Sequence, residues 1–222
     1  MTSEQVFVLR VQWERYRFPF TLALLCIFYG VGTVGILSPH SELFVQLTFA
    51  NLVLTAVLLL SNAAGFGVRG VMAFALSVSV GFFVELLGVK TGVIFGAYYY
   101  TERLGPRLLE VPLVIGLNWA LLVHATHAWL SERLRPRTFM AAVGATVMTS
   151  FDWVMEPVAI RLRFWLWQAD VPPLRNYVAW WGLSFLLLLA SDRISPRPKN
   201  RLARWVLAVM LLFFAITGVK DP

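Results

Sequence analysis

The sequence predicts an all-α protein: a polytopic transmembrane bundle of six to seven spans, with a re-entrant or interfacial segment around residues 88–110. Two features of the composition indicate this class. The 222 residues are 59% hydrophobic and only 14% charged, whereas a soluble domain has about 25% charged residues. The mean hydropathy is +0.71, and apolar residues gather in runs that are long enough to cross a bilayer. We therefore expect residues 1–222 to form a single integral membrane domain.

The first three predicted spans follow a polar lead-in at residues 1–17. The apolar run that begins at Phe18 is too long for a signal-peptide core and lacks a clear cleavage site, so we expect a retained span. Pro39 favours a turn after this span, and the glycines of residues 61–69 favour a loop before the third. The three spans are expected at residues 18–37, 43–60 and 70–87.

The connection from residue 88 to residue 110 differs from the other connections. Glycine and proline interrupt it too often for a span, and it is too aromatic for a free loop. Its three consecutive tyrosines, Tyr98, Tyr99 and Tyr100, are typical of the headgroup layer of a membrane. We therefore expect a re-entrant or interfacial segment here.

Four more apolar runs complete the predicted bundle. A loop with three arginines precedes the fifth span, which ends at Pro157. A tryptophan-rich connection at residues 158–175 follows it, and the last span is short. These spans are expected at residues 111–130, 139–157, 174–190 and 205–219.

The lysines and arginines predict how the bundle is oriented. With seven spans, the segments on the N-terminal side of the membrane hold 12 of the 19 basic residues, and the opposite segments hold 7. Because basic residues concentrate on the cytoplasmic side, we expect a cytoplasmic N-terminus in the bacterial cytoplasmic membrane. The net charge of +7 then indicates contact with anionic membrane lipid, and we expect no nucleic acid partner.

Span order brings the polar residues of four spans into one layer near one membrane face. Carboxyl groups are expensive inside a membrane, so an ionisable residue there is a functional candidate. Asp152 and Glu156 are four positions apart, which places both on one face of a helix. The candidate catalytic residues are Asp152, Glu156 and Glu85. The candidate substrate-binding residues are Asn118, Trp119, Trp165, Trp167, Asn176, Tyr177, Trp180 and Trp181.

Carboxyls and aromatic rings in a water-poor site indicate a particular chemistry. A carboxyl that stays protonated can act as a general acid. Aromatic faces stabilise a cation, such as the carbocation that forms when an alkene is protonated. The alternative is that the two glutamates are interfacial residues paired with Lys90, Arg161 or Arg163.

His124 and His127 raise the question of a metal, because histidines at this spacing can ligate one together with carboxylates. The sequence has no Glu-x-x-His pair and no second histidine pair, so we interpret both as hydrogen-bonding or interfacial residues. It also has no pattern typical of a serine or cysteine nucleophile, a phosphate-binding loop or a dinucleotide site. We therefore expect no metal.

Several motifs between residues 85 and 181 are shared with a known family. They are the stretch 85–100, Leu104-Gly-Pro106, Val111-Pro112, Asn118-Trp119, Asp152-x-x-x-Glu-Pro-Val-Ala159, Trp165-x-Trp167, Val171-Pro172 and Asn176-Tyr-x-x-Trp-Trp181. Over about residues 70–190 the chain therefore resembles the membrane carotenoid hydratases of the CruF type, a group of carotenoid biosynthesis proteins. One departure is Glu156 before Pro157, where other branches of the family have aspartate; both side chains supply a carboxyl.

The resemblance implies an enzyme that adds water across the terminal C1=C2 double bond of an acyclic ψ-end group, in γ-carotene or a related carotene. The product would be a tertiary 1-hydroxy carotenoid. We expect Asp152 or Glu156 to protonate C2, and water positioned by a second carboxylate to attack the cation at C1. The resemblance implies a carotenoid (polyene) substrate, membrane lipid around the bundle, other carotenoid biosynthesis enzymes as partners, and no cofactor.

Two other functions fit the same residues. A carotenoid end-group cyclase also protonates an alkene but excludes water from the cation. A membrane protein that binds or transports a lipid or small molecule could use the same carboxyls, amides and aromatics. Transporters, however, usually show internal repeats and place polar residues near the midplane, whereas this chain shows no repeat and its polar layer lies toward one face.

Overall fold

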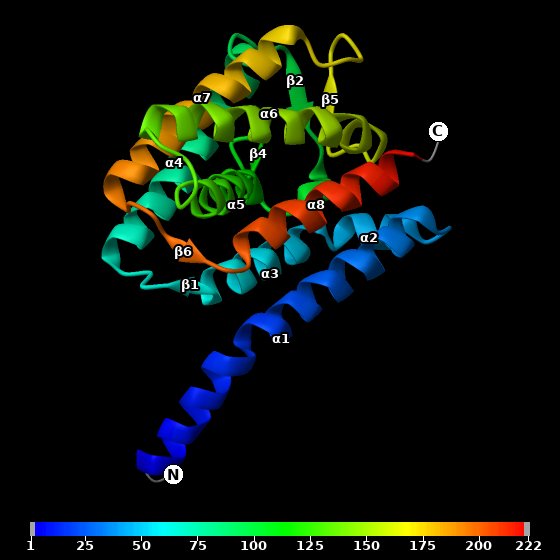
Figure 1. The fold of residues 1–222 in the computed structure, drawn as a ribbon. Helices are drawn as coiled ribbons and strands as arrows, with labels where there is room; N and C mark the ends of the chain where they lie inside the picture. The colour runs from blue at the N-terminus through cyan, green and yellow to red at the C-terminus, as the bar shows by residue number, and fades with distance from the viewer. Residues whose placement is uncertain (1–2, 220–222) are drawn as a thin grey trace.

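The computed structural model describes the backbone of residues 3–219 and the side chains of residues 15–219. In this part of the chain eight α-helices pack into a bundle, which confirms the predicted fold class (Figure 1). The helices are α1 (Ser3–Leu37), α2 (Ser41–Gln46), α3 (Thr48–Ser61), α4 (Val68–Thr91), α5 (Leu113–Leu130), α6 (Arg137–Arg161), α7 (Leu174–Ile194) and α8 (Ala203–Gly218).

Short antiparallel ribbons and one 3-10 turn connect the helices. Each ribbon has two strands. Strands β1 (Ala63–Ala64) and β6 (Lys199–Asn200) form one ribbon, β2 (Tyr98–Tyr100) and β5 (Trp165–Trp167) the second, and β3 (Arg107–Leu108) and β4 (Val111–Pro112) the third; the 3-10 turn η1 is Glu102–Leu104.

Four helical segments are long and apolar enough to cross a membrane. Two shorter apolar helices, α3 and α8, and the 21-residue α7 coincide with the remaining predicted spans. The number of six to seven spans therefore stays a prediction, while the bundle of apolar helices is observed. The four segments are Arg15–Leu37, Val68–Thr91, Leu113–Leu130 and Arg137–Arg161.

Three boundaries differ from the sequence prediction. The lead-in predicted at 1–17 is helical from Ser3 onward and continues into the first span. The second predicted span is interrupted at Leu47, between α2 and α3. The fifth does not end at Pro157, because a proline removes only one backbone donor and α6 continues to Arg161.

Helix α5 is the centre of the bundle. In its apolar segment 83% of the residues are buried, compared with 28% in the segments of α1 and α4. Figure 1 shows α5 enclosed by α4, α6, α7 and α8. Small residues permit the close approach: a Cβ at Gly116 would lie 2.7 Å from the Val78 carbonyl oxygen, and one at Gly81 would lie 2.5 Å from Trp119 Cβ. The α4–α5 contact thus positions Trp119 deep inside the molecule.

Helix α4 continues to Thr91, and the rest of the segment to residue 110 folds as short strands, turns and η1 across one end of the bundle. Its strand β2 pairs with β5, and this ribbon lies beside α6 in Figure 1. Because side chains alternate along a strand, Tyr98 and Tyr100 point inward and are each 7% exposed, whereas Tyr99 is 52% exposed. Tyr98 and Tyr100 therefore belong to the core and Tyr99 faces outward, while the re-entrant or interfacial position of the segment stays a prediction.

Candidate active site

A small cavity of about 40 Å³ lies under the β2–β5 ribbon, and all three predicted catalytic carboxyls line it. They come from α4 and α6, while α5, α7 and β5 supply the other predicted residues. The predicted substrate-binding residues at this cavity are Asn118, Trp119, Trp165, Trp167, Asn176 and Trp180. The span order that predicted a common layer thus corresponds to one site.

Glu85 is buried and accepts three hydrogen bonds. Tyr98 Oη donates to Glu85 Oε2 at 2.5 Å, and Tyr100 Oη donates to the same oxygen at 2.9 Å. The indole Nε1 of Trp119 donates to Oε1 at 2.9 Å. Since all three partners donate, both oxygens act as acceptors, and the contacts suit an ionised carboxylate.

The two tyrosines stay protonated in this arrangement. Burial, and next the adjacent Glu85 carboxylate, raise the pKa of Tyr98 and of Tyr100 well above the usual tyrosine range. Both hydroxyls therefore remain hydrogen-bond donors to Glu85 over the physiological pH range.

Asp152 has a different environment from Glu85. It is 1% exposed, and its Oδ2 accepts a hydrogen bond from Asn176 Nδ2 at 2.8 Å. Its Oδ1 is also buried, and no group among the described residues hydrogen-bonds to it. A buried oxygen without a partner disfavours the ionised form of a carboxyl group. It suits the protonated form, whose O–H can be donated to a bound molecule.

Glu156 lies one helical turn from Asp152 and receives two indole groups. Trp165 Nε1 and Trp167 Nε1 donate to Glu156 Oε2 at 3.1 and 3.0 Å. Both tryptophans point inward from β5, and Leu166 between them points the other way. Both indoles bind Oε2, so the other oxygen, Oε1, can accept a proton or a water molecule.

Aromatic rings form the walls of the cavity. Trp119 and Trp180 stack with their centroids 4.1 Å apart, and Tyr98 lies 4.9 Å from Trp167 across the ribbon. Tyr100 meets Trp165 edge-on at 5.9 Å. The carboxyl groups therefore face π-systems and indole N–H groups rather than bulk water.

Among the residues that the structure describes, no ion pair joins Glu85 or Glu156 to Lys90, Arg161 or Arg163, which was the alternative for the two glutamates. Lys90 binds Glu110 at 2.7 Å. Arg161 donates to the Thr217 carbonyl oxygen at 2.5 Å, and the side chain of Arg163 is exposed. The glutamates face the cavity because the helices that carry them pack against α5 and α7.

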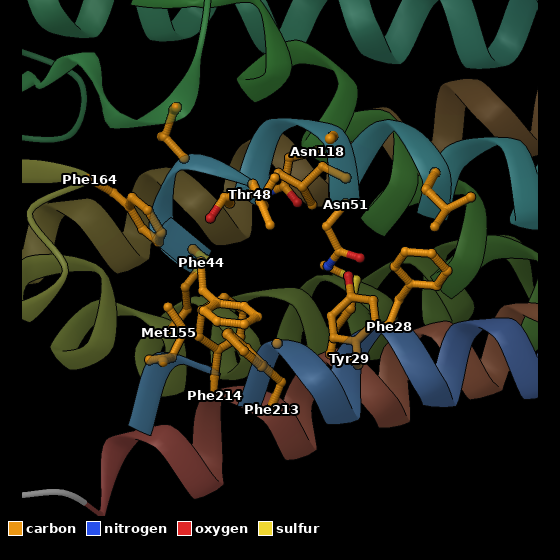
Figure 2. Close-up of a pocket in the computed structure, with 18 of the residues that line it drawn as sticks. Phe28, Tyr29, Phe44, Thr48, Asn51, Asn118, Met155, Phe164, Phe213 and Phe214 are labelled. Atoms are coloured by element: carbon orange, nitrogen blue, oxygen red, sulfur yellow. The ribbon is translucent and has the colours of Figure 1, made fainter. Parts of the chain in front are cut away.

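A larger apolar cavity adjoins the carboxyl cavity. It has a volume of about 460 Å³, which lies within the roughly 300–1,000 Å³ typical of ligand sites. Figure 2 shows Phe44, Phe213 and Phe214 on one side of it and Thr48 and Asn51 on another. Four residues line both cavities, so the two are separated by a single layer of side chains: Ile115, Asn118, Met155 and Trp165.

Two predicted site residues lie outside the carboxyl cavity. Tyr177 is half-buried and does not line it. Trp181 is 39% exposed, stacks on Phe185 and donates to Thr146 Oγ1 at 3.1 Å. Tyr177 and Trp181 directly follow the inward-facing residues Asn176 and Trp180. One step along a helix rotates the side chain by about 100°, so both point away from the cavity.

Sequence reasoning missed other residues at the cavity. Tyr98 and Tyr100 both donate hydrogen bonds to Glu85. Their sequence signal is the inward–outward alternation of side chains along a strand, and the paired stretch Trp165-Leu166-Trp167 has the same alternation. The apolar residues Phe95, Ile115 and Met155 complete the lining. These three have no sequence signal beyond hydrophobicity.

The two histidines lie away from this cavity. His127 Nε2 is 3.1 Å from Asp192 Oδ1, and Arg137 Nε is 2.6 Å from Asp192 Oδ2. His124 contacts Phe66 edge-on, with centroids 5.5 Å apart. Among the described residues no group of three histidine, cysteine, aspartate or glutamate side chains is arranged to hold a metal ion.

The fold and the site define a membrane helix bundle with a buried carboxyl cluster next to an apolar cavity. The chain belongs to the carotenoid biosynthesis protein family, whose sequence profile matches residues 43–220. The match begins earlier than the resemblance expected from about residue 70. No solved structure matches the chain significantly.

The chain is also similar to bisanhydrobacterioruberin hydratase of Haloarcula japonica. The two are 30% identical over 148 residues, which cover 61% of this chain and 50% of the relative. The chain thus spans about half the length of that curated relative.

Proposed function

We propose that this protein is a carotenoid hydratase that adds water to the terminal C1=C2 double bond of an acyclic ψ-end group. The observation that carries the proposal is the convergence of Glu85, Asp152 and Glu156 on one aromatic cavity, which shares four lining residues with an adjacent apolar cavity. The family and the hydratase relative support the same reaction class. γ-Carotene or a related carotene with an acyclic end is the proposed substrate.

Asp152 is the proposed general acid. Its Oδ1 is the buried carboxyl oxygen without a partner among the described residues, while Asn176 holds Oδ2. The proton on Oδ1 passes to C2 of the alkene, and the π electrons form the new C2–H bond. A tertiary cation remains at C1. Trp119 and Trp180 supply aromatic faces, and Glu85 supplies a nearby negative charge.

Glu156 is the proposed base for the second step. A cavity of about 40 Å³ has room for water, since one molecule needs roughly 10–15 Å³. The water oxygen bonds to C1 and gives its extra proton to Glu156 Oε1. The product is the tertiary alcohol, and transfer of a proton from Glu156 to Asp152 restores both groups. One alkene and one water are consumed, so no oxidant or reductant is needed.

The apolar cavity is the proposed site for the polyene. Its lining is mostly phenylalanine, leucine and other apolar residues from α1, α3 and α8. Such a surface binds a hydrocarbon by excluding water and offers it no reactive group. In this proposal the terminal part of the polyene passes between the four shared residues to reach the carboxyls.

Pigment analysis tests the reaction. The full chain is expressed in bacteria that make lycopene or γ-carotene, and extracts are separated by chromatography with mass detection. We expect a more polar product that is heavier by one water molecule. A shifted pigment of unchanged mass would contradict hydration and indicate a cyclase. Unchanged pigment in both hosts, with the protein present in membranes, would favour binding or transport.

Filling the apolar cavity tests the place of the polyene. Gly32 lines this cavity, and the nearest atom to a Cβ there would be Phe213 Cε2 at 3.9 Å. Gly32→Phe should therefore block substrate and abolish most conversion while the helix stays intact. Gly30→Phe is the matched control, because Gly30 is exposed on the same helix and a Cβ there meets nothing within 4 Å. Equal conversion by both variants would place the polyene elsewhere.

A further inference from the structure

A second, unrelated pocket lies at the end of the bundle away from the β2–β5 ribbon. It has a volume of about 370 Å³ and is lined by the ends of α5 and α8, by β6 and by Phe18 and Leu22 of α1. Figure 1 shows β6 and the first turn of α8 at this end. The carboxyl cavity lies at the other end, so this pocket takes no part in the proposed hydration.

The pocket is strongly basic at its mouth. Its charged residues are Arg133, Lys199, Arg201, Arg204 and one acid, Glu132, which gives a net charge of +3. All five side chains are exposed. Four cations within one pocket attract a group with negative charge, such as a phosphate.

Aromatic rings hold two of the cations in place. The guanidinium carbon of Arg201 lies 4.7 Å from the centre of the Phe18 ring, and that of Arg204 lies 5.3 Å from the centre of the Trp205 ring. Arg133 donates to the Trp129 carbonyl oxygen at 2.5 Å. These contacts keep three arginines at the rim of the pocket, where they are available to an anion.

An apolar groove continues from the basic pocket along the bundle. It has a volume of about 850 Å³ and runs between α6 and α8. It shares Trp129, Arg204 and Trp205 with the basic pocket, so the two spaces adjoin. Most of its other lining residues are apolar, with two hydroxyls from Thr146 and Ser150, and Ala208 and Leu211 are exposed on the outer face of α8.

We propose that the basic pocket and this groove together form a binding site for an anionic phospholipid of the surrounding membrane. The phosphate headgroup lies among the arginines, and an acyl chain lies in the α6–α8 groove. Charge complementarity favours an anionic headgroup, and a basic pocket beside an apolar groove matches the two parts of one lipid. A free phosphate would use only the first part.

Lipid retention measured by native mass spectrometry tests this site. The full chain in detergent is titrated with phosphatidylglycerol or phosphatidylcholine, and bound lipids are counted. We expect the unaltered protein to retain phosphatidylglycerol preferentially. Arg201→Gln with Arg204→Gln should reduce that preference about 30-fold, since each cation near an anionic headgroup contributes roughly fivefold and the two contributions multiply. Equal retention of the two lipids by the unaltered protein would overturn the proposal.

Two further variants make the result specific. Arg163→Gln with Arg175→Gln removes the same charge from exposed side chains elsewhere in the chain and should leave the preference unchanged. Ala208→Phe fills the groove at an exposed position and should weaken phosphatidylglycerol retention with every arginine in place. Displacement of the lipid by inorganic phosphate, together with no effect of Ala208→Phe, would indicate a free-anion site and overturn the lipid assignment. Circular dichroism of each variant checks that the helices are retained.

Discussion

The sharpest test of the proposed acid is Asp152→Asn. The substitution keeps the shape of the side chain, and the amide oxygen can still accept the hydrogen bond that Asn176 Nδ2 now donates at 2.8 Å. The amide NH₂ then occupies the position of Oδ1. Because Oδ1 has no hydrogen-bond partner among the described residues, the substitution breaks no hydrogen bond there. We therefore expect a change in unfolding free energy of no more than about 1 kcal/mol.

The catalytic effect of the same substitution should be large. An amide cannot deliver a proton to an alkene carbon, and a positioned general acid contributes about 10²–10⁴-fold to a rate. The assay is the initial rate of hydrated product formation in isolated membranes, normalised to protein. Asp170→Asn is the control, since Asp170 is exposed and its φ of 61° is one that asparagine tolerates. A rate for Asp152→Asn within about threefold of the unaltered protein would refute this assignment of the acid.

Two other predictions follow from the contacts of the carboxyl cavity. Tyr98→Phe removes one hydrogen-bond donor to the buried Glu85 carboxylate and should lower the hydration rate about tenfold or more. Tyr99→Phe is the control, because Tyr99 is exposed, and should leave the rate unchanged. Equal rates for the two variants would contradict a role for the Tyr98 hydroxyl. Gly81→Ala puts a Cβ about 2.5 Å from Trp119 Cβ and should lower Tm through about 1–3 kcal/mol of overpacking. Gly182→Ala, where a Cβ meets nothing within 4 Å, should not lower Tm, and a similar loss in both variants would argue against this packing.

Hydropathy and span order predicted the frame of the site. Apolar runs located the helices, because a bilayer requires about 20 apolar residues per span. Alternation of direction then placed Glu85, Asn118 and Asp152 at one end without knowledge of any contact. This reasoning used only the length and order of the runs, which are local properties of the sequence.

The contacts that surround the carboxyls could not be predicted in the same way. They depend on the pairing of Tyr98 with Trp167 and of Tyr100 with Trp165, two strands that are far apart in the sequence. Such a ribbon forms because α4 and α6, which both pack against α5 and α7, bring the two strands to the same end of the bundle. The aromatic content was visible, but which rings point inward depended on strand register, and a shift of one residue reverses it.

The hydrogen bonds to Glu85 bear on a problem that any such hydratase must solve. A carboxylate near a tertiary cation stabilises it, but it can also bond to it and form an ester. Glu85 accepts three hydrogen bonds on its two oxygens, so three of its roughly four lone-pair positions are engaged and its nucleophilicity is reduced while its charge remains. Glu156 has both indoles on one oxygen and so keeps Oε1 free to take a proton from water. On this argument Tyr98→Phe should do more than slow hydration: it should allow the cation to be trapped, which mass spectrometry of the intact variant would detect as a covalent carotenoid adduct.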